Sequence, residues 1–273
     1  MSGLIKAELI RLTKSKSMIV CIVLSIALGI AVALLYNYFW EQKGENIARS
    51  YALMRQYGMN TELLDTALSS LPENNLWSYI SFFFTDGSIW LESAACVCAF
   101  LSSEYTMGTL KNSVSRGCSR WQIYLSKLIS GIVNVLIVAI FYVGAGGVTA
   151  YFLVDRNTSI GVSDIILILF CYLLLIIATA SVFQMLAVFF RKTGLAVAAA
   201  VITPIIMSSI LNLLVNIDEH YRVYSRYLLM ESYISVQPSV LAGDWIITVI
   251  TALAYLAVST AAGLFAFYKS EIR

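Results

Sequence analysis

The chain has 273 residues, of which 59% are hydrophobic and only 12% are charged, and its net charge is +2. A soluble protein of this length could not bury so large an apolar fraction, because much of its exterior must still meet water. The small net charge provides no basic footprint for nucleic acid. The single histidine argues against a metal site built from histidines and against a Ser-His triad. The composition therefore predicts an all-α membrane protein.

Six apolar stretches are long enough to cross a bilayer as helices, since one span takes about 20 residues. We predict spans at 18–39, 86–104, 126–153, 164–190, 195–216 and 245–268. The rest of the chain then divides into an interfacial segment, two outer loops, a cytoplasmic connection and a short tail: 1–17, 40–85, 217–244, 105–125 and 269–273. The whole chain is predicted to be a single transmembrane domain.

The segment 1–17 reads as an amphipathic helix. Ile5, Leu9 and Leu12 recur at helical spacing on one face, while Lys6 and Arg11 lie elsewhere. Such a helix lies in the headgroup plane with its basic residues on anionic lipid. Two roles are open for it: a plain topogenic anchor, or an elbow helix that braces a transporter against its partner.

The two outer loops differ in length and composition. Leucines among charges in the loop 40–85 predict helical pieces there. The loop 217–244 is rich in tyrosine, with Tyr221, Tyr224, Tyr227 and Tyr233. Tyrosines in such a position fit the aromatic belt at the membrane surface, and substrate contact is the alternative.

The connection that follows the second span is longer than a simple join between two helices requires. Gly117 is a natural break, and Ser119 followed by Gln122 three residues later forms a capping box. A helix is therefore predicted to start near Arg120 and to continue into the third span. A further short helix is predicted between Thr109 and Ser115.

The distribution of Lys and Arg predicts the orientation. Twelve of the 18 lie in the N-terminal segment, the connection 105–127, the pair Arg191–Lys192 and the tail. Positive residues collect on the cytoplasmic side of membrane proteins. Both termini are therefore predicted to be cytoplasmic, which an even number of spans allows.

One run of residues in this connection resembles a known family. It reads Glu104-Tyr105-x-x-Gly108-Thr109-Leu110-Lys111-Asn112, then Ser115-Arg116-Gly117-x-Ser119-Arg120 and Tyr124-x-x-Lys127. This run is similar to the cytoplasmic motif of ABC-2 type permeases, in particular the small bacterial permeases that export peptides, bacteriocins or drugs. The layout of an amphipathic start, a long first outer loop, six spans and a short tail is also similar.

The resemblance implies a type V exporter-like permease in a bacterial cell membrane, working as two permeases with two separate ATPase subunits. The region 108–124 would be the coupling segment that seats on the ATPase. The implied coupling residues are Glu104, Gly108, Thr109, Leu110, Lys111, Arg116, Gly117, Ser119, Arg120, Trp121 and Tyr124. The second permease could be a copy of this chain or a different one. The implied cargo is amphipathic or hydrophobic, a peptide or a drug.

The nucleotide chemistry is expected on the partner. The sequence has no G-x-x-x-x-G-K-[ST] motif, and its closest glycines, Gly144, Gly146 and Gly147, lie in an apolar span without the following Lys. We therefore expect no cofactor and no catalytic site in this chain, with ATP and Mg²⁺ bound by the ATPase subunit.

Polar residues and a proline within the spans are candidates for a substrate path. Glu92 is an ionisable residue in the second span, which is costly and often functional; it could recognise a cationic peptide, form an interhelical hydrogen bond or sit at the interface. Asn134, Gln184 and Asn212 could line the path or simply pack helices together. Pro204 removes a backbone hydrogen bond and is expected to kink the fifth span.

Three other functions compete with the exporter. An ion-coupled secondary transporter would show inverted repeats and paired acidic residues at the midplane, and the sequence has one Glu there at best. An intramembrane metalloprotease would need H-E-x-x-H, which one histidine cannot supply. A non-transporting sensor or immunity subunit that sequesters a peptide stays open.

Overall fold

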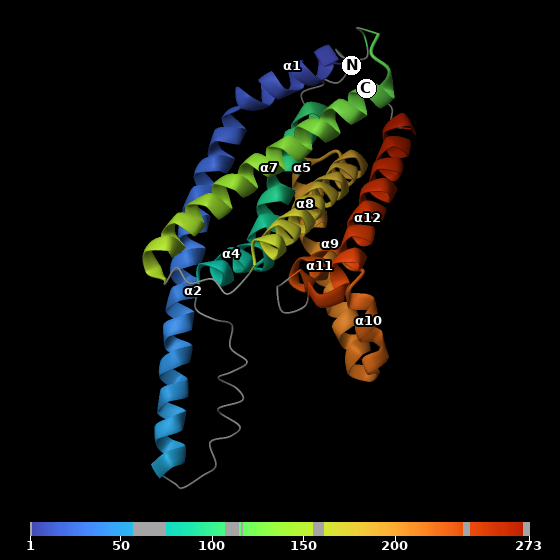
Figure 1. The fold of residues 1–273 in the computed structure, drawn as a ribbon. Coiled ribbons are helices and arrows are strands. Elements are labelled where there is room, and N and C mark those ends of the chain that lie inside the picture. The colour runs from blue at the N-terminus through green and yellow to red at the C-terminus, as the bar shows by residue number, and fades with distance from the viewer. Residues whose placement is uncertain are drawn as a thin grey trace.

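The computed structural model describes residues 2–56, 75–106, 115, 117–154, 161–236 and 241–269. All regular structure in these residues is helical, as the composition predicts. Five helices are long and apolar enough to cross a membrane. They are α2 (Lys16–Gln56), α7 (Arg120–Leu153), α8 (Val162–Phe190), α9 (Thr193–Ile217) and α12 (Leu241–Lys269) (Figure 1). The chain is therefore a multi-pass helical membrane protein.

The region of the second predicted span is not a single helix. Helices α4 (Leu76–Thr85) and α5 (Ser88–Thr106) are bent by 46° relative to each other, and only together do they meet the criteria for a span. The break is built by Asp86 and Gly87. Gly87 has a φ of +82°, which a glycine adopts without strain. The Asp86 carboxylate accepts from the Ser88 backbone N–H at 3.0 Å and from the Tyr142 hydroxyl of α7 at 2.7 Å, so the bend is fastened to a neighbouring span.

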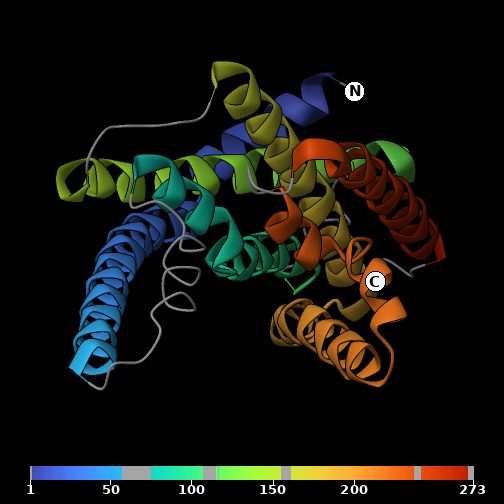
Figure 2. The same ribbon diagram turned by 60° about the horizontal axis from the view of Figure 1, so that its bottom comes forward.

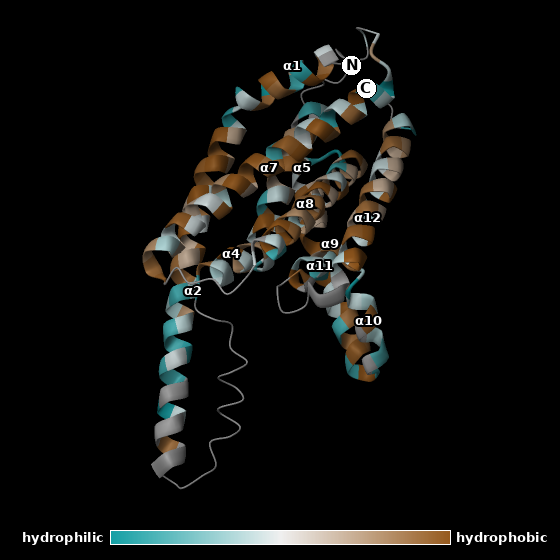
Figure 3. Ribbon diagram, viewed as in Figure 1, coloured by the Kyte–Doolittle hydropathy of each residue, from teal (hydrophilic) through white to brown (hydrophobic). Residues whose placement is uncertain are grey.

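The loop expected at 40–85 is helical at both described ends. Helix α2 continues to Gln56, and α4 begins at Leu76, with Asn75 accepting from the Ser78 N–H as its N-cap. Figure 3 shows why α2 is longer than its span: its lower part changes from apolar to hydrophilic where it leaves the other helices. The apolar part alone packs against the bundle.

The region that follows α9 folds back on the bundle. It contains a 3₁₀ turn η1 (Glu219–Tyr221), α10 (Arg222–Ser225) and α11 (Leu229–Ser235). Its tyrosines separate into two groups. Tyr221, Tyr224 and Tyr227 are exposed, as a membrane-surface belt would require, whereas Tyr233 is buried and shares a 2.9 Å hydrogen bond with Thr179 of α8. For Tyr233 the surface-belt interpretation is therefore wrong.

Helices α7 and α8 form the centre of the bundle. Helix α2 packs along α7, α12 packs along α8, and α5 contacts both central helices (Figures 1 and 2). Three glycines permit the closest approaches. A Cβ on Gly29 of α2 would strike the backbone of α7 at Tyr142, one on Gly146 of α7 would strike the ring of Phe83, and one on Gly263 of α12 would strike the hydroxyl of Tyr124. Helix α9 is the least enclosed of the five, with 11% of its apolar window buried.

The N-terminal helix α1 (Ser2–Thr13) lies against α7. Ser15 separates it from α2, where the Ser15 hydroxyl accepts from the Met18 N–H at 3.2 Å. Figure 1 shows α1, the end of α5, the start of α7 and the end of α12 at the same end of the bundle. Helix α1, the end of α5 and the start of α7 are therefore neighbours in space.

Candidate functional site

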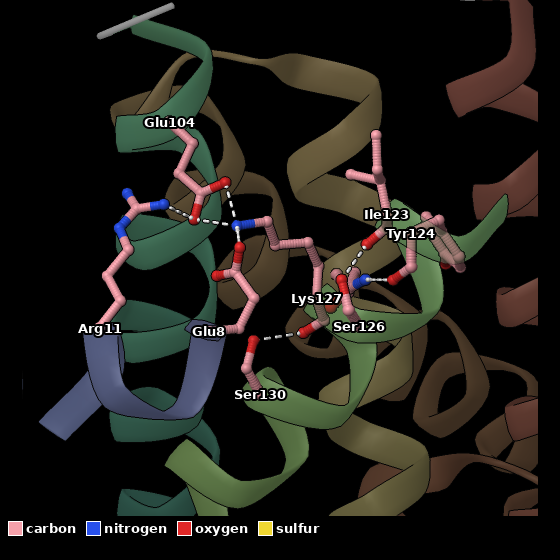
Figure 4. Close-up of polar contacts among 9 residues, drawn as sticks. Glu8, Arg11, Glu104, Ile123, Tyr124, Ser126, Lys127 and Ser130 are labelled. Atoms are coloured by element: carbon pink, nitrogen blue, oxygen red, sulfur yellow. Dashed lines mark hydrogen bonds and ion pairs between the residues drawn. The ribbon is translucent and has the colours of Figure 1, made fainter. Parts of the chain in front are cut away.

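Four charged side chains from three helices meet at this end of the bundle (Figure 4). Lys127 of α7 is at the centre, with its Nζ 2.5 Å from Glu8 Oε1 of α1 and 2.5 Å from Glu104 Oε2 of α5. Arg11 of α1 donates to Glu104 Oε1 at 2.8 Å. The ring of Phe100 lies beneath both cations, with its centroid 5.6 Å from the Arg11 guanidinium carbon and 6.0 Å from Lys127 Nζ. We call these four charged residues the ionic cluster.

The ionic cluster is enclosed by protein. The side chains of Glu104 and Lys127 are 1% and 3% exposed, and only Arg11 reaches solvent substantially. Two anions and two cations compensate one another when all are ionised, which is the condition under which buried charges are tolerated.

The position of each residue in the ionic cluster follows from the sequence of its own helix. Glu8 and Arg11 are three residues apart and therefore share one face of α1. Phe100 lies four residues before Glu104, so its ring stacks one turn below the carboxylate on α5. Lys127 lies in the third turn of α7, which begins at Arg120 as the capping box predicts: Gln122 Oε1 accepts from the Ser119 N–H at 3.3 Å.

The predicted coupling residues fall into three groups. Gly108, Thr109, Leu110, Lys111 and Arg116 lie outside the described residues. Gly117 and Trp121 are exposed, while Ser119 and Arg120 are partly buried, with Arg120 donating to the Tyr268 carbonyl at the end of α12. Glu104 and Tyr124 are buried inside the bundle. These last two residues therefore pack against other helices and are not available on the surface.

The residues proposed for a substrate path do not converge. Glu92 is 9% exposed, so protein surrounds it in place of water, and Ser25 of α2 is a polar neighbour of its carboxyl group. Gln184 donates to the Tyr124 carbonyl at 3.1 Å, which is a packing role. Asn134 is buried within α7, and Asn212 is on the exposed side of α9. Helix α9 continues through Pro204 without ending there. Among the described residues, no hydrogen bond joins any two of these five.

Glu8 was not singled out from the sequence, and Lys127 was named only as the last residue of the run that resembles the permease motif. Lys127 counts among the basic residues that set the orientation, yet the structure buries it against two carboxylates. Arg11 was expected to face lipid headgroups, and instead it pairs with Glu104. The sequence did contain one indication of this pairing. A Glu three residues before an Arg places both charges on one face of the amphipathic helix, where both can contact the same neighbouring helix.

Nothing in the described part of the chain is suited to hold a metal, since no three His, Cys, Asp or Glu side chains gather there. The ionic cluster links three helices. It joins α1, the end of α5 and the start of α7 into one unit, and residues 107–119 leave and return at that unit.

Residues 46–273 match the family DUF2705, which is described as a protein of unknown function. The chain belongs to this family. The match takes in Glu104 and Lys127 and begins after Glu8 and Arg11, so half of the ionic cluster lies within the family region and half precedes it. No curated protein and no solved structure matches the chain.

Proposed function

We propose that this chain is the permease subunit of an ATP-driven exporter of the ABC-2 type and that it pairs with a separate ATPase. The ionic cluster is the observation that supports this best. A transporter without its own nucleotide site needs a segment that receives motion from its partner and passes it to the spans. Residues 107–119 emerge between α5 and α7, and Glu104 and Lys127 join those two helices at the point of emergence.

Two further contacts suit that role. Helix α7 is one continuous helix of 34 residues, so displacement of its start at Arg120 would be carried along its whole length. Arg120 also donates to the carbonyl of Tyr268, which links the same point to the end of α12. Motion applied at the connection would therefore reach α1, α5, α7 and α12 together.

The remaining parts of the proposal follow from the family resemblance and the charge pattern. The working unit would be two permeases, identical or different, with two ATPases that bind ATP and Mg²⁺. The membrane would be a bacterial cell membrane, with both termini in the cytoplasm. The cargo would be an amphipathic or hydrophobic peptide or drug, since an interior with so few charges suits molecules that partition into lipid.

Copurification tests the proposal. The protein, extracted from its native membrane in a mild detergent, is expected to bring down an ATPase, and deletion of 108–118 is expected to remove it. A matched pair of charge reversals sharpens the assignment: Lys111→Glu with Arg116→Glu should release the ATPase, whereas Lys43→Glu with Arg49→Glu, on the predicted outer side, should retain it. If no ATPase copurifies, an ion-coupled transporter or a sequestering subunit becomes the better-supported function.

A further inference from the structure

A cavity of about 270 Å³ lies among the spans on the opposite side of the bundle from α2. Its floor is α8, with Phe183, and the edge of Trp90 from α5. Its two side walls are α9, through Pro204 and Met207, and α12, through Val258. Both side-wall helices pack against α8, and the space between them is where the cavity opens.

Helix α11 closes the outer end of the cavity through Leu228, Leu229 and Met230. This short helix is held firmly against α8. The Tyr233 hydroxyl shares a 2.9 Å hydrogen bond with Thr179, and the Tyr172 hydroxyl donates to the Tyr233 carbonyl at 3.4 Å. The cavity is thus closed toward the outer face and open sideways, where α9 and α12 expose apolar side chains to lipid.

The lining is almost entirely apolar and unsuited to water. Four of its 16 lining residues carry a hydroxyl: Thr203, Ser208, Tyr255 and Ser259. The Ser259 hydroxyl already bonds to Ser181 and the Tyr255 hydroxyl to the backbone of Leu229, so two of the four are engaged with protein. A buried water needs about 2–4 polar partners close together, and the other twelve lining residues are apolar. Apolar cavities of this kind stay dry and accept apolar ligands.

The size of the cavity narrows the choice of ligand. Pockets for drug-sized molecules occupy about 300–1,000 Å³, and this cavity is just below that range. A slender hydrocarbon chain fits such a space, whereas a folded peptide does not. We propose that the cavity holds one acyl chain of a bilayer phospholipid, which enters sideways between α9 and α12 and ends beneath α11. The inference is independent of the proposed transport function, since a lipid would bind there in either case.

Photo-crosslinking tests it on the full chain in lipid nanodiscs. The probe is a phosphatidylglycerol that carries a diazirine on one acyl chain, and labelled positions are mapped by mass spectrometry. We expect labelling of cavity residues above that of the lipid-facing side of α2. Met207 and Ile206 of α9 are both 50% exposed, and only Met207 lines the cavity. Met207→Trp should therefore lose the cavity labelling and Ile206→Trp should keep it.

A second pair of variants tests the opposite wall of the cavity, which α12 forms. Val258→Trp of α12 should also remove the labelling, while Leu253→Trp, which is exposed on the same helix away from the cavity, should not. This pair keeps the test decisive if Met207→Trp fails to fold. Uniform labelling over all lipid-facing helices, or labelling that persists in the folded cavity variants, would overturn the proposal. Labelling by a diazirine fatty acid and not by the phospholipid would overturn the assignment to phospholipid.

Discussion

The indole N–H of Trp90 on α5 donates to the backbone carbonyl of Ala200 on α9, over 3.1 Å. That carbonyl is four residues before Pro204, so it is the one whose helical donor the proline lacks. A side chain from a neighbouring span thus replaces the missing backbone bond. This is how α9 continues through Pro204, because in lipid an unsatisfied carbonyl costs several kcal/mol, of order 2–7.

Replacing Trp90 by Phe should therefore leave the Ala200 carbonyl unsatisfied and lower the free energy of unfolding by about 1–3 kcal/mol. Pro204→Ala supplies an N–H that can bond to the same carbonyl. In the Pro204→Ala background the cost of Trp90→Phe should be smaller, which a double-mutant cycle of unfolding free energies in bicelles would measure. An equal cost in both backgrounds would show that the two residues act separately.

The ionic cluster should be sensitive to removal of its central cation. Lys127→Met leaves Glu8 and Glu104 buried beside each other with only Arg11 to compensate them, and should destabilise the protein by about 3–5 kcal/mol. Arg49→Met is the matched control, since it breaks an exposed pair with Glu45 that contributes about 0.3–0.5 kcal/mol or less. Thermal unfolding in detergent provides the comparison, and similar shifts for the two variants would contradict the structural role of the ionic cluster.

The close contact of α2 with α7 should depend on Gly29. In Gly29→Ala the new methyl group would meet the α7 backbone at Tyr142, which cannot move aside as a side chain can, and the cost should be about 1–3 kcal/mol. Gly144 is also a helical glycine, but the space around it is open. Gly144→Ala should therefore leave the melting temperature unchanged or slightly raised. The prediction fails if both alanine variants melt alike.

Gly117 should be necessary for the connection between α5 and α7. Its φ is +80°, whereas proline is restricted to about −65°. If the chain is the permease subunit proposed above, Gly117→Pro is expected to abolish ATPase-stimulated transport without affecting membrane insertion, measured by transport in proteoliposomes with the copurified ATPase. Gly117→Asn is the control, because Asn tolerates positive φ better than most residues, and it should retain activity. Normal transport by the proline variant would reject the coupling role of this segment.

The helical content and five of the spans could be predicted because lipid demands long apolar helices that satisfy their own backbone hydrogen bonds. The bend at Asp86 and Gly87 was not predicted. The run from Leu76 to Ser102 is apolar on both sides of the bend. Gly87 adopts the positive φ that the break requires, and a hydrogen bond from Tyr142, more than fifty residues away in sequence, fastens the bend. Pro204 was expected to distort α9 because proline has no backbone N–H to donate. The indole of Trp90, which is distant in sequence, supplies the missing hydrogen bond to the Ala200 carbonyl.

By itself the sequence determined the medium in which this protein folds, the position of most spans and the start of α7 at Arg120, because each depends on local composition or on neighbours within one helical turn. Only the tertiary structure decided that Glu8, Arg11, Glu104 and Lys127 form one buried ionic cluster. Pairing of charges from three helices depends on which helix faces are turned toward one another. That choice is made by packing contacts such as Gly29 on Tyr142, which no local pattern contains.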